Sequence, residues 1–174
     1  MNTPVILIGH GIRAAGLEDR AHEILEAGIP VLSSWQAADL VDNHHRLYFG
    51  RPGLWGQRCA NHVLAHADTV IAVGNRCSLW NVGYNGLEGK RLLMVDCDPN
   101  EVERLGAELL EENIEYWLNR IGREPAAKCH AWVDQCMKWR MSFPWVEPGT
   151  HDDTDFIHPW RFTKALEQFF GRTR

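Results

Sequence analysis

Residues 4–14 read PVILIGHGIRA and join a continuously apolar run to a glycine-rich turn. A short β-branched run without polar alternation is typical of a strand buried on both faces, as in a parallel sheet. Gly9 and Gly11 follow at once, with the spacing G-x-G-x-x-A. This spacing suits a sharp turn in which backbone amides approach a phosphate at the start of a helix, although a tight turn alone explains it as well. The stretch therefore predicts the first strand and turn of an α/β fold.

The rest of the chain repeats this pattern of apolar run, turn and helix. The resulting alternation predicts a doubly wound parallel sheet of five or six strands with helices on both faces. Ligands of such sheets bind beyond the carboxyl ends of the strands. The further strands are expected at 29–32, 69–73, 91–95 and, more weakly, 107–110, and the helices at 17–27, 57–67, from 98 onward, 113–121, 126–141 and 158–170.

The composition narrows the class of protein. The net charge is −5 and 45% of the residues are hydrophobic, which argues against nucleic acid or a membrane as a partner. Five cysteines without a C-x-x-C pair favour free thiols in a reducing cytoplasm. Five of the eight tryptophans lie between 117 and 160, which fits either core filling or packing against a partner.

The loops after the predicted strands carry the candidate ligand contacts. Glycines at 53 and 56 flank bulky residues before a helix, where backbone amides can approach a ligand. Arg76 follows a buried strand and is placed to grip a phosphate or stack on a ring. Asp98 is explained as a helix cap, whereas Asp96 is a candidate acceptor for ribose or adenine. The second strand ends in Ser33 without the acid that holds the ribose in dinucleotide folds, which weakens a nicotinamide interpretation.

The sequence gives little support for a metal site or for covalent catalysis. His62 and His66 are four residues apart, but the glutamate of a zincin is missing, so surface or core histidines are expected. A solvated acidic linker explains residues 151–158 better than a metal site does. We expect neither catalytic nor metal-binding residues in this chain.

Four blocks together resemble the central domain of thiamine-diphosphate-dependent enzymes of the acetolactate synthase type. The blocks are PVILIGHGI, IPVLSSWQAADLVDNHH, LYFGRPGLWGQRCANHVLAHADTVIAVGNRC and RLLMVDCDPNEV, spread over about residues 2–122. Residues 156–170 resemble the first helix of the domain that follows. The resemblance implies a central domain of the Rossmann-like, DHS-like NAD/FAD-binding fold at 1–124. At 125–174 it implies a helical linker with the start of the next cofactor-binding domain.

The resemblance also implies a parent enzyme that decarboxylates a 2-keto acid and transfers the resulting carbanion equivalent. Thiamine diphosphate and magnesium would be held by the other two domains of the parent, a homo-oligomer, and this chain would be structural. The central domain of the family binds FAD, binds ADP or has lost its ligand. Carried over by motif, the cofactor contacts would be Gly9, His10, Gly11, Ser34, Trp35, Gly53, Leu54, Trp55, Gly74, Arg76, Asp96 and Cys97.

Several departures from the family keep other interpretations open. Flavin binders continue past the arginine with acids and a second arginine, whereas this chain has Cys77 and then Ser78 to Asn81. Trp55 stands where the family has a histidine, and Glu112-Asn113 stands in place of a glycine-aspartate pair. FAD, ADP-like nucleotides and an empty site all remain. The alternatives are a stand-alone FAD/NAD-type nucleotide-binding domain and a nicotinamide-dependent oxidoreductase module.

Overall fold

The structure is a computed structural model that describes residues 2–121, 129–145 and 157–171. It divides into a unit of residues 1–142 and a unit of residues 143–174. The first unit contains β1 (Pro4–Ile8), α1 (Gly11–Ala14), η1 (Glu18–Ala27), β2 (Val31–Ser33), η2 (Trp35–Ala37), α2 (Arg58–His66), β3 (Thr69–Val73), α3 (Leu79–Val82), β4 (Arg91–Val95), α4 (Pro99–Leu105), β5 (Glu108–Glu111), α5 (Ile114–Ile121) and α6 (His130–Ser142), and the second contains α7 (Pro159–Gly171).

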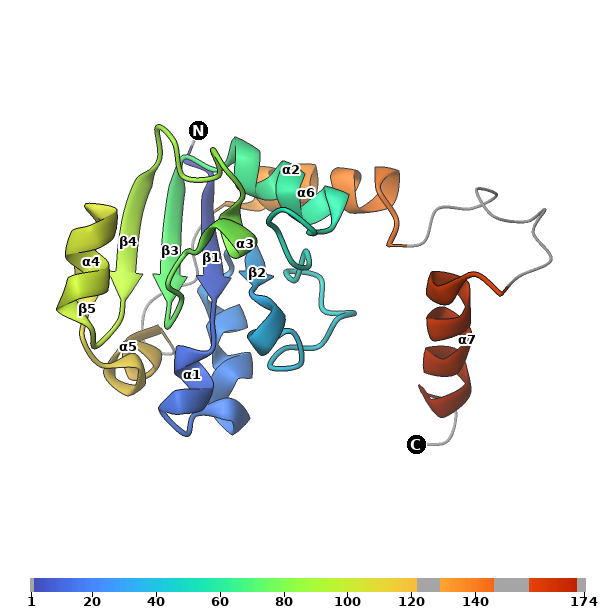
Figure 1. Cartoon of the computed structure of the whole chain (residues 1–174), viewed down its shortest axis with the longest axis horizontal. Coiled ribbons are helices and arrows are strands. Elements are labelled where there is room, and N and C mark those ends of the chain that lie inside the picture. The colour runs from blue at the N-terminus through green and yellow to red at the C-terminus, as the bar shows by residue number, and fades with distance from the viewer. Residues whose placement is uncertain (1, 122–128, 146–156, 172–174) are drawn as a thin grey trace. The chain divides into compact units, whose positions relative to one another are not determined.

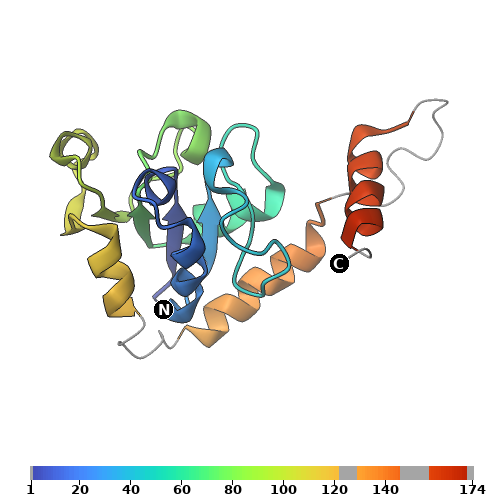
Figure 2. The ribbon, with the colours of Figure 1, turned by 90° about the horizontal axis from the view of Figure 1, so that it is seen from below.

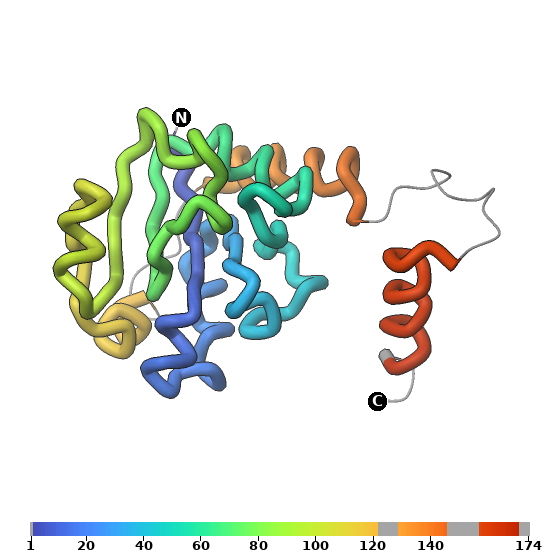
Figure 3. The backbone as a smooth tube through the Cα atoms, viewed as in Figure 1, coloured from blue at the N-terminus to red at the C-terminus, as the bar shows by residue number. Residues whose placement is uncertain are grey.

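The five strands form one parallel sheet in the order β2-β1-β3-β4-β5 (Figure 1). β1 is an interior strand that pairs with both β2 and β3, and its residues from Val5 to Ile8 are fully buried, as the uninterrupted apolar run predicted. The prediction of a doubly wound parallel sheet is confirmed. Each strand ends in the same direction, which brings the loops after β1 to β4 to one edge of the sheet (Figure 3). We call this the carboxyl edge.

Helices cover the sheet on both sides (Figure 2). One face packs against α1, η1 and α5 through a core that joins Ile6, Val73 and Val95 of the strands to Ile24 and Leu118 of the helices. η1 lies within the helix predicted at 17–27 but is wound as a 3₁₀ helix. In 3₁₀ winding, residues three apart lie on the same side, and Ala21 and Ile24 are both fully buried.

α6 packs against α2 and is part of the first unit. The Trp132 indole donates to the carbonyl of Pro4 at 2.9 Å, and Arg140 donates to the carbonyls of His45, Tyr48 and Asn43 at 2.9, 3.2 and 3.3 Å. These bonds attach α6 to the start of β1 and to the connection after β2. The predicted boundary between 1–124 and 125–174 stays a prediction, and residues 122–128 and 146–156 lie outside the described ranges.

α7 belongs to the second unit. It carries a series of exposed apolar side chains. Among the described residues, neither α7 nor any other helix is long and apolar enough to cross a membrane. The exposed apolar residues of α7 are Trp160, Phe162, Leu166, Phe169 and Phe170.

Candidate functional site

The loops after β1 and β3 are locked together at the carboxyl edge. Gly9 N donates to Val73 O and Gly11 N donates to Gly74 O, both at 2.9 Å. A Cβ on Gly9 would lie 2.2 Å from Gly74 O, and one on Gly11 would lie 2.5 Å from Gly74 Cα. Only glycine permits this approach, and Gly74 itself has φ +55°. The glycine spacing therefore serves contact between two backbones, and these two N–H groups are used within the protein. We call this contact the glycine clasp.

His10 is exposed between the two glycines and begins α1 without a side-chain hydrogen bond to the helix. Because it follows β1 directly, His10 lies in a loop of the carboxyl edge.

The end of β2 holds two buried polar atoms without a partner. Ser34 is 2% exposed, and its Oγ makes no hydrogen bond. The guanidinium carbon of Arg51 lies 4.9 Å from the centre of the half-exposed Trp35 ring, and Arg51 Nε is also buried and unpaired. Below them, Ser33 Oγ and Tyr48 Oη lie 2.8 Å apart, and burial raises the pKa of Tyr48. Buried polar atoms are normally satisfied, so Ser34 and Arg51 mark a place suited to a further polar group.

The loop before α2 is held by a side-chain amide. Gly53 N donates to Asn61 Oδ1 at 2.8 Å, and Asn61 Nδ2 donates back to Gly53 O at 3.1 Å. Gly53 has φ +110°, and a Cβ there would lie 1.8 Å from the carbonyl oxygen of Trp80. Leu54 and Trp55 are exposed, Trp55 by 75%. The loop is thus fixed against α3 while it presents an aromatic ring to solvent.

Asn75 is a buried residue that the sequence did not single out. Its Nδ2 donates to Ile8 O and its Oδ1 accepts from Cys77 N, both at 2.9 Å. It thereby joins the ends of β1 and β3 and holds Cys77 at φ +46°, which is rare outside glycine. Burial raises the pKa of the Cys77 thiol to about 12, which disfavours the thiolate form.

Arg76 at the end of β3 is paired with Glu101 of α4. Arg76 Nε donates to Glu101 Oε1 at 2.9 Å, and Arg76 Nη2 donates to the same oxygen. Arg104 donates to Glu101 Oε2 at 2.6 and 3.0 Å. Hydrogen bonds from the two guanidinium groups lower the pKa of the Glu101 carboxyl. Glu101 is buried, whereas the side chains of Arg76 and Arg104 are 76% and 50% exposed.

The loop after β4 is organised by its own acids. Asp98 Oδ1 accepts from Asn100 N at 3.0 Å and caps α4, as predicted. Asp96 Oδ1 accepts from Asp98 N at 3.1 Å, so this carboxylate also has a local role. Cys97 lies between them and is exposed.

Parallel strand order brings these loops into one row. Neighbouring strands lie about 4.8 Å apart, so the loops after β2 and β4, three spacings apart, are separated by about 14 Å. That span suits an extended nucleotide better than a single phosphate. Exposed large hydrophobic side chains occur in these loops and in α3, and the aromatic ones among them are suited to stacking: Trp35, Leu54, Trp55, Leu79, Trp80 and Tyr84.

A pocket of about 600 Å³ opens beside α3. Buried Cys77 and Val82 line it together with Leu79, Tyr84 and Glu88. Its lining mixes apolar and polar side chains, and none of the lining residues is among the cofactor contacts that the resemblance implied.

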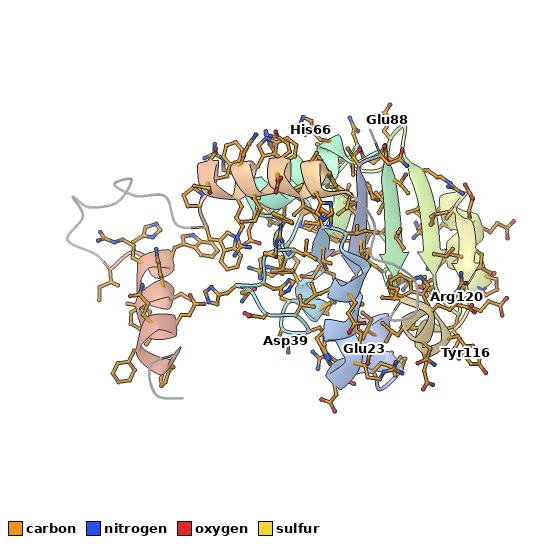
Figure 4. The ribbon with its side chains drawn as sticks, turned by 180° about the vertical axis from the view of Figure 1, so that it is seen from behind. Glu23, Asp39, His66, Glu88, Tyr116 and Arg120 are labelled. Carbon is orange, nitrogen blue, oxygen red and sulfur yellow. The ribbon has the colours of Figure 1, made fainter. Side chains whose placement is uncertain are left out.

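The two histidines of α2 lie away from this edge. His66 Nδ1 lies 2.8 Å from His62 O. Both imidazoles contact Trp139 of α6, whose ring centre lies 4.7 Å from that of His66 and 5.5 Å from that of His62. Figure 4 places His66 at the end of the sheet where the strands begin. Within the described ranges no three His, Cys, Asp or Glu side chains gather closely enough to hold a metal ion.

A family model described as "Thiamine pyrophosphate enzyme, central domain" matches residues 1–110. Relatives with assigned activities are similar over various lengths. The acetolactate synthase isozyme 3 large subunit of Escherichia coli is 25% identical over 182 residues, covering 93% of this chain and 31% of that protein. The pyruvate oxidase of Lactiplantibacillus plantarum is 33% identical over 97 residues, covering 55% of this chain and 16% of that protein.

The sulfoacetaldehyde acetyltransferase of Castellaniella defragrans is 23% identical over 196 residues, covering 95% of this chain and 33% of that protein. The chain therefore spans a third or less of the length of these relatives.

Proposed function

Because this chain belongs to the family of thiamine pyrophosphate enzyme central domains, we propose that it is the non-catalytic middle domain of an acetolactate synthase-like enzyme. In this role it holds the flanking domains of its parent in place. The parent would decarboxylate a 2-keto acid and join the product to an acceptor. The parent's thiamine diphosphate, which stabilises the carbanion formed on decarboxylation, and its magnesium would be bound by those flanking domains.

The observation that carries the scaffold role is the glycine clasp. It fixes the loop after β1 to the loop after β3 through backbone contacts, and Asn75 and Asn61 fix the neighbouring loops through their amides. Loops tied in this way form a rigid edge against which other polypeptide can be positioned. Rigidity at an edge is what a central domain contributes to a catalytic centre formed elsewhere.

The same edge is proposed to bind a nucleotide, FAD or ADP. The residues present fit such a ligand in part: Ser34 offers an unpaired buried hydroxyl, Trp35 and Trp55 offer ring faces, and Arg76 offers a guanidinium. The first glycine loop fits a diphosphate poorly, because the N–H groups of Gly9 and Gly11 already donate to carbonyls. We expect the parent to be a homo-oligomer. We also expect it in the cytoplasm, where the reducing environment keeps cysteines free, in keeping with the five free cysteines of this chain.

Two measurements test this function. The purified chain, supplied with pyruvate, thiamine diphosphate and Mg²⁺, should release no CO₂ above the buffer rate, and turnover would contradict the scaffold role. Melting curves with FAD, ADP and NAD rank the ligands, because a ligand that binds only the folded chain stabilises it. We expect FAD or ADP to raise the melting temperature more than NAD, and enhancement of NADH fluorescence would favour the oxidoreductase alternative.

A further inference from the structure

One surface of the first unit gathers exposed aromatic rings around α3. Trp55 lies in the loop before α2, Trp80 lies in α3 and Tyr84 follows α3, and these three side chains are 75%, 58% and 81% exposed. A Cβ on Gly53 would lie 1.8 Å from the carbonyl oxygen of Trp80, so the segments that carry the rings are in contact. We call this surface the aromatic face, and its members are Leu54, Trp55, Leu79, Trp80 and Tyr84.

The area of the aromatic face is large enough for a protein interface. An aromatic side chain has about 150–250 Å² to bury, so at these exposures the three rings leave roughly 400 Å² open to water. Contiguous apolar patches of more than a few hundred Å² are rare on soluble monomers and commonly mark interaction sites. A stable interface buries about 800 Å² per partner, and about 65% of that area is apolar in homodimers. The rings and the two leucines therefore supply most of the apolar area that one half of a dimer interface needs.

The aromatic face also contains a pocket. The pocket beside α3 has a volume of about 600 Å³ and is lined in part by Leu79, Val82 and Tyr84. Among the described residues that line it, Glu88 alone carries a charge, and the cores of interfaces are poor in charged residues. Trp80 is the neighbour of Leu79 on α3, so an exposed indole stands beside the pocket. Such a surface can be complementary to itself, because a two-fold axis brings each ring to the pocket of the other copy.

We propose that the aromatic face binds a second copy of this chain about a two-fold axis, with Trp80 of each copy entering the pocket beside α3 of the other. This inference goes beyond the proposed scaffold role and does not depend on a bound nucleotide. In the homo-oligomer expected of the parent, it assigns a contact between two central domains to a defined surface.

The aromatic face is held in place before a partner arrives. The loop that carries Trp55 is fixed by the two hydrogen bonds between Gly53 and Asn61. A Cβ on Gly86 would lie 1.8 Å from the carbonyl oxygen of Val82, so the segment after α3 packs back against that helix. Surfaces that are ordered in advance lose less conformational entropy on binding. The exposed rings therefore belong to a prearranged surface.

The test is sedimentation velocity of the purified chain over a range of concentrations. The unchanged chain should sediment mainly as a dimer at roughly 100 μM, because interfaces of this size have Kd values of about 1 μM or lower. Trp80→Ser should raise the Kd of the dimer about 30-fold, the loss expected of a central aromatic anchor. The matched control is Phe169→Ser, because Phe169 of α7 is also an exposed aromatic residue but is not part of the aromatic face. This control should dimerise as the unchanged chain does.

Each outcome has a defined meaning. A chain that stays monomeric at this concentration would overturn the inference and leave the scaffold role standing, because that role requires no self-association. Turnover of pyruvate by the chain would contradict the scaffold role and leave the dimer untouched. If Trp80→Ser dimerises as well as the unchanged chain, the aromatic face is not the interface.

The control also separates the aromatic face from α7. A dimer that is lost in Phe169→Ser and kept in Trp80→Ser would assign the association to α7, and an equal loss in both variants would indicate unspecific association. Either result would contradict the proposal. Tyr84→Ser provides a second variant if Trp80→Ser does not fold; it should weaken the dimer, and an unchanged Kd would exclude the aromatic face as the interface.

Discussion

Replacing Gly9 by alanine tests whether the glycine clasp determines stability. The new Cβ would lie 2.2 Å from Gly74 O, and that oxygen belongs to backbone rather than to a flexible side chain. To reach ordinary contact the two loops must separate by roughly an ångström, which stretches the 2.9 Å bond between Gly11 N and Gly74 O beyond hydrogen-bonding distance.

Overpacking of a tight site costs about 1–3 kcal/mol, and loss of one backbone hydrogen bond costs about 1 kcal/mol. Alanine also lowers the conformational entropy of the unfolded chain, which stabilises the folded state by about 0.4–1 kcal/mol and offsets part of this loss. We therefore expect Gly9→Ala to lower the free energy of unfolding by about 2–3 kcal/mol, a large part of the ~5–15 kcal/mol that holds a domain folded.

The assay is urea unfolding followed by circular dichroism. The matched control is Gly16→Ala, because nothing lies within 4 Å of a Cβ at Gly16 and its φ of +70° adds only local backbone strain. That control should lose about 1 kcal/mol, partly offset by the same effect on the unfolded chain. If Gly9→Ala is no less stable than Gly16→Ala, the steric argument for the glycine clasp is refuted.

Three further changes probe other parts of the structure. The pKa of Glu101 is lowered from 4.5 in the folded chain, so its ionised form stabilises above that pH and the benefit is lost as the pH falls through the lowered value. Glu101→Gln should therefore reduce the urea midpoint at pH 7, and this effect should shrink as the pH falls below 4.5; a loss that does not change with pH would contradict the ion pairs. Trp132→Phe removes the hydrogen bond to Pro4 and should cost about 1 kcal/mol, seen as a fall of about 2–4 °C in melting temperature; an unchanged melting temperature would mean that this bond contributes nothing. In the folded chain at pH 8, Cys97 should react with a maleimide long before Cys77, whose pKa is raised to about 12, and Cys97→Ser should abolish the fast reaction.

The strands were the most predictable part of the molecule. β3 and β4 begin and end as expected, because an apolar run between turn residues has few other solutions in a parallel sheet. β2 was expected at 29–32 and lies at Val31–Ser33, and β5 was expected at 107–110 and lies at Glu108–Glu111. Strand ends depend on pairing with neighbours, which local sequence does not contain. The four-residue helix α3 was missed for a different reason, because it is too short to show a helical period.

The candidate site was predictable only as a set of loops. Sequence spacing placed Gly9, Gly11 and Gly74 at turns, but their contact with one another follows from the pairing of β1 with β3. The pairing of Arg76 with Glu101 joins residues 25 apart on different elements and has no local signal. The assignment of the predicted contact residues to a cofactor stays a prediction.

The bond from Trp132 to Pro4 joins residues 128 apart, and β1 pairs with a strand that begins at Thr69. Within this domain β1 is therefore synthesised before every strand and helix that packs against it. At about 5–20 residues per second, the indole that covers its first residue arrives at least several seconds later. Until then a strand as apolar as VILI is available to chaperones and to other nascent chains, so slowing synthesis between residues 10 and 130 should increase aggregation of this protein.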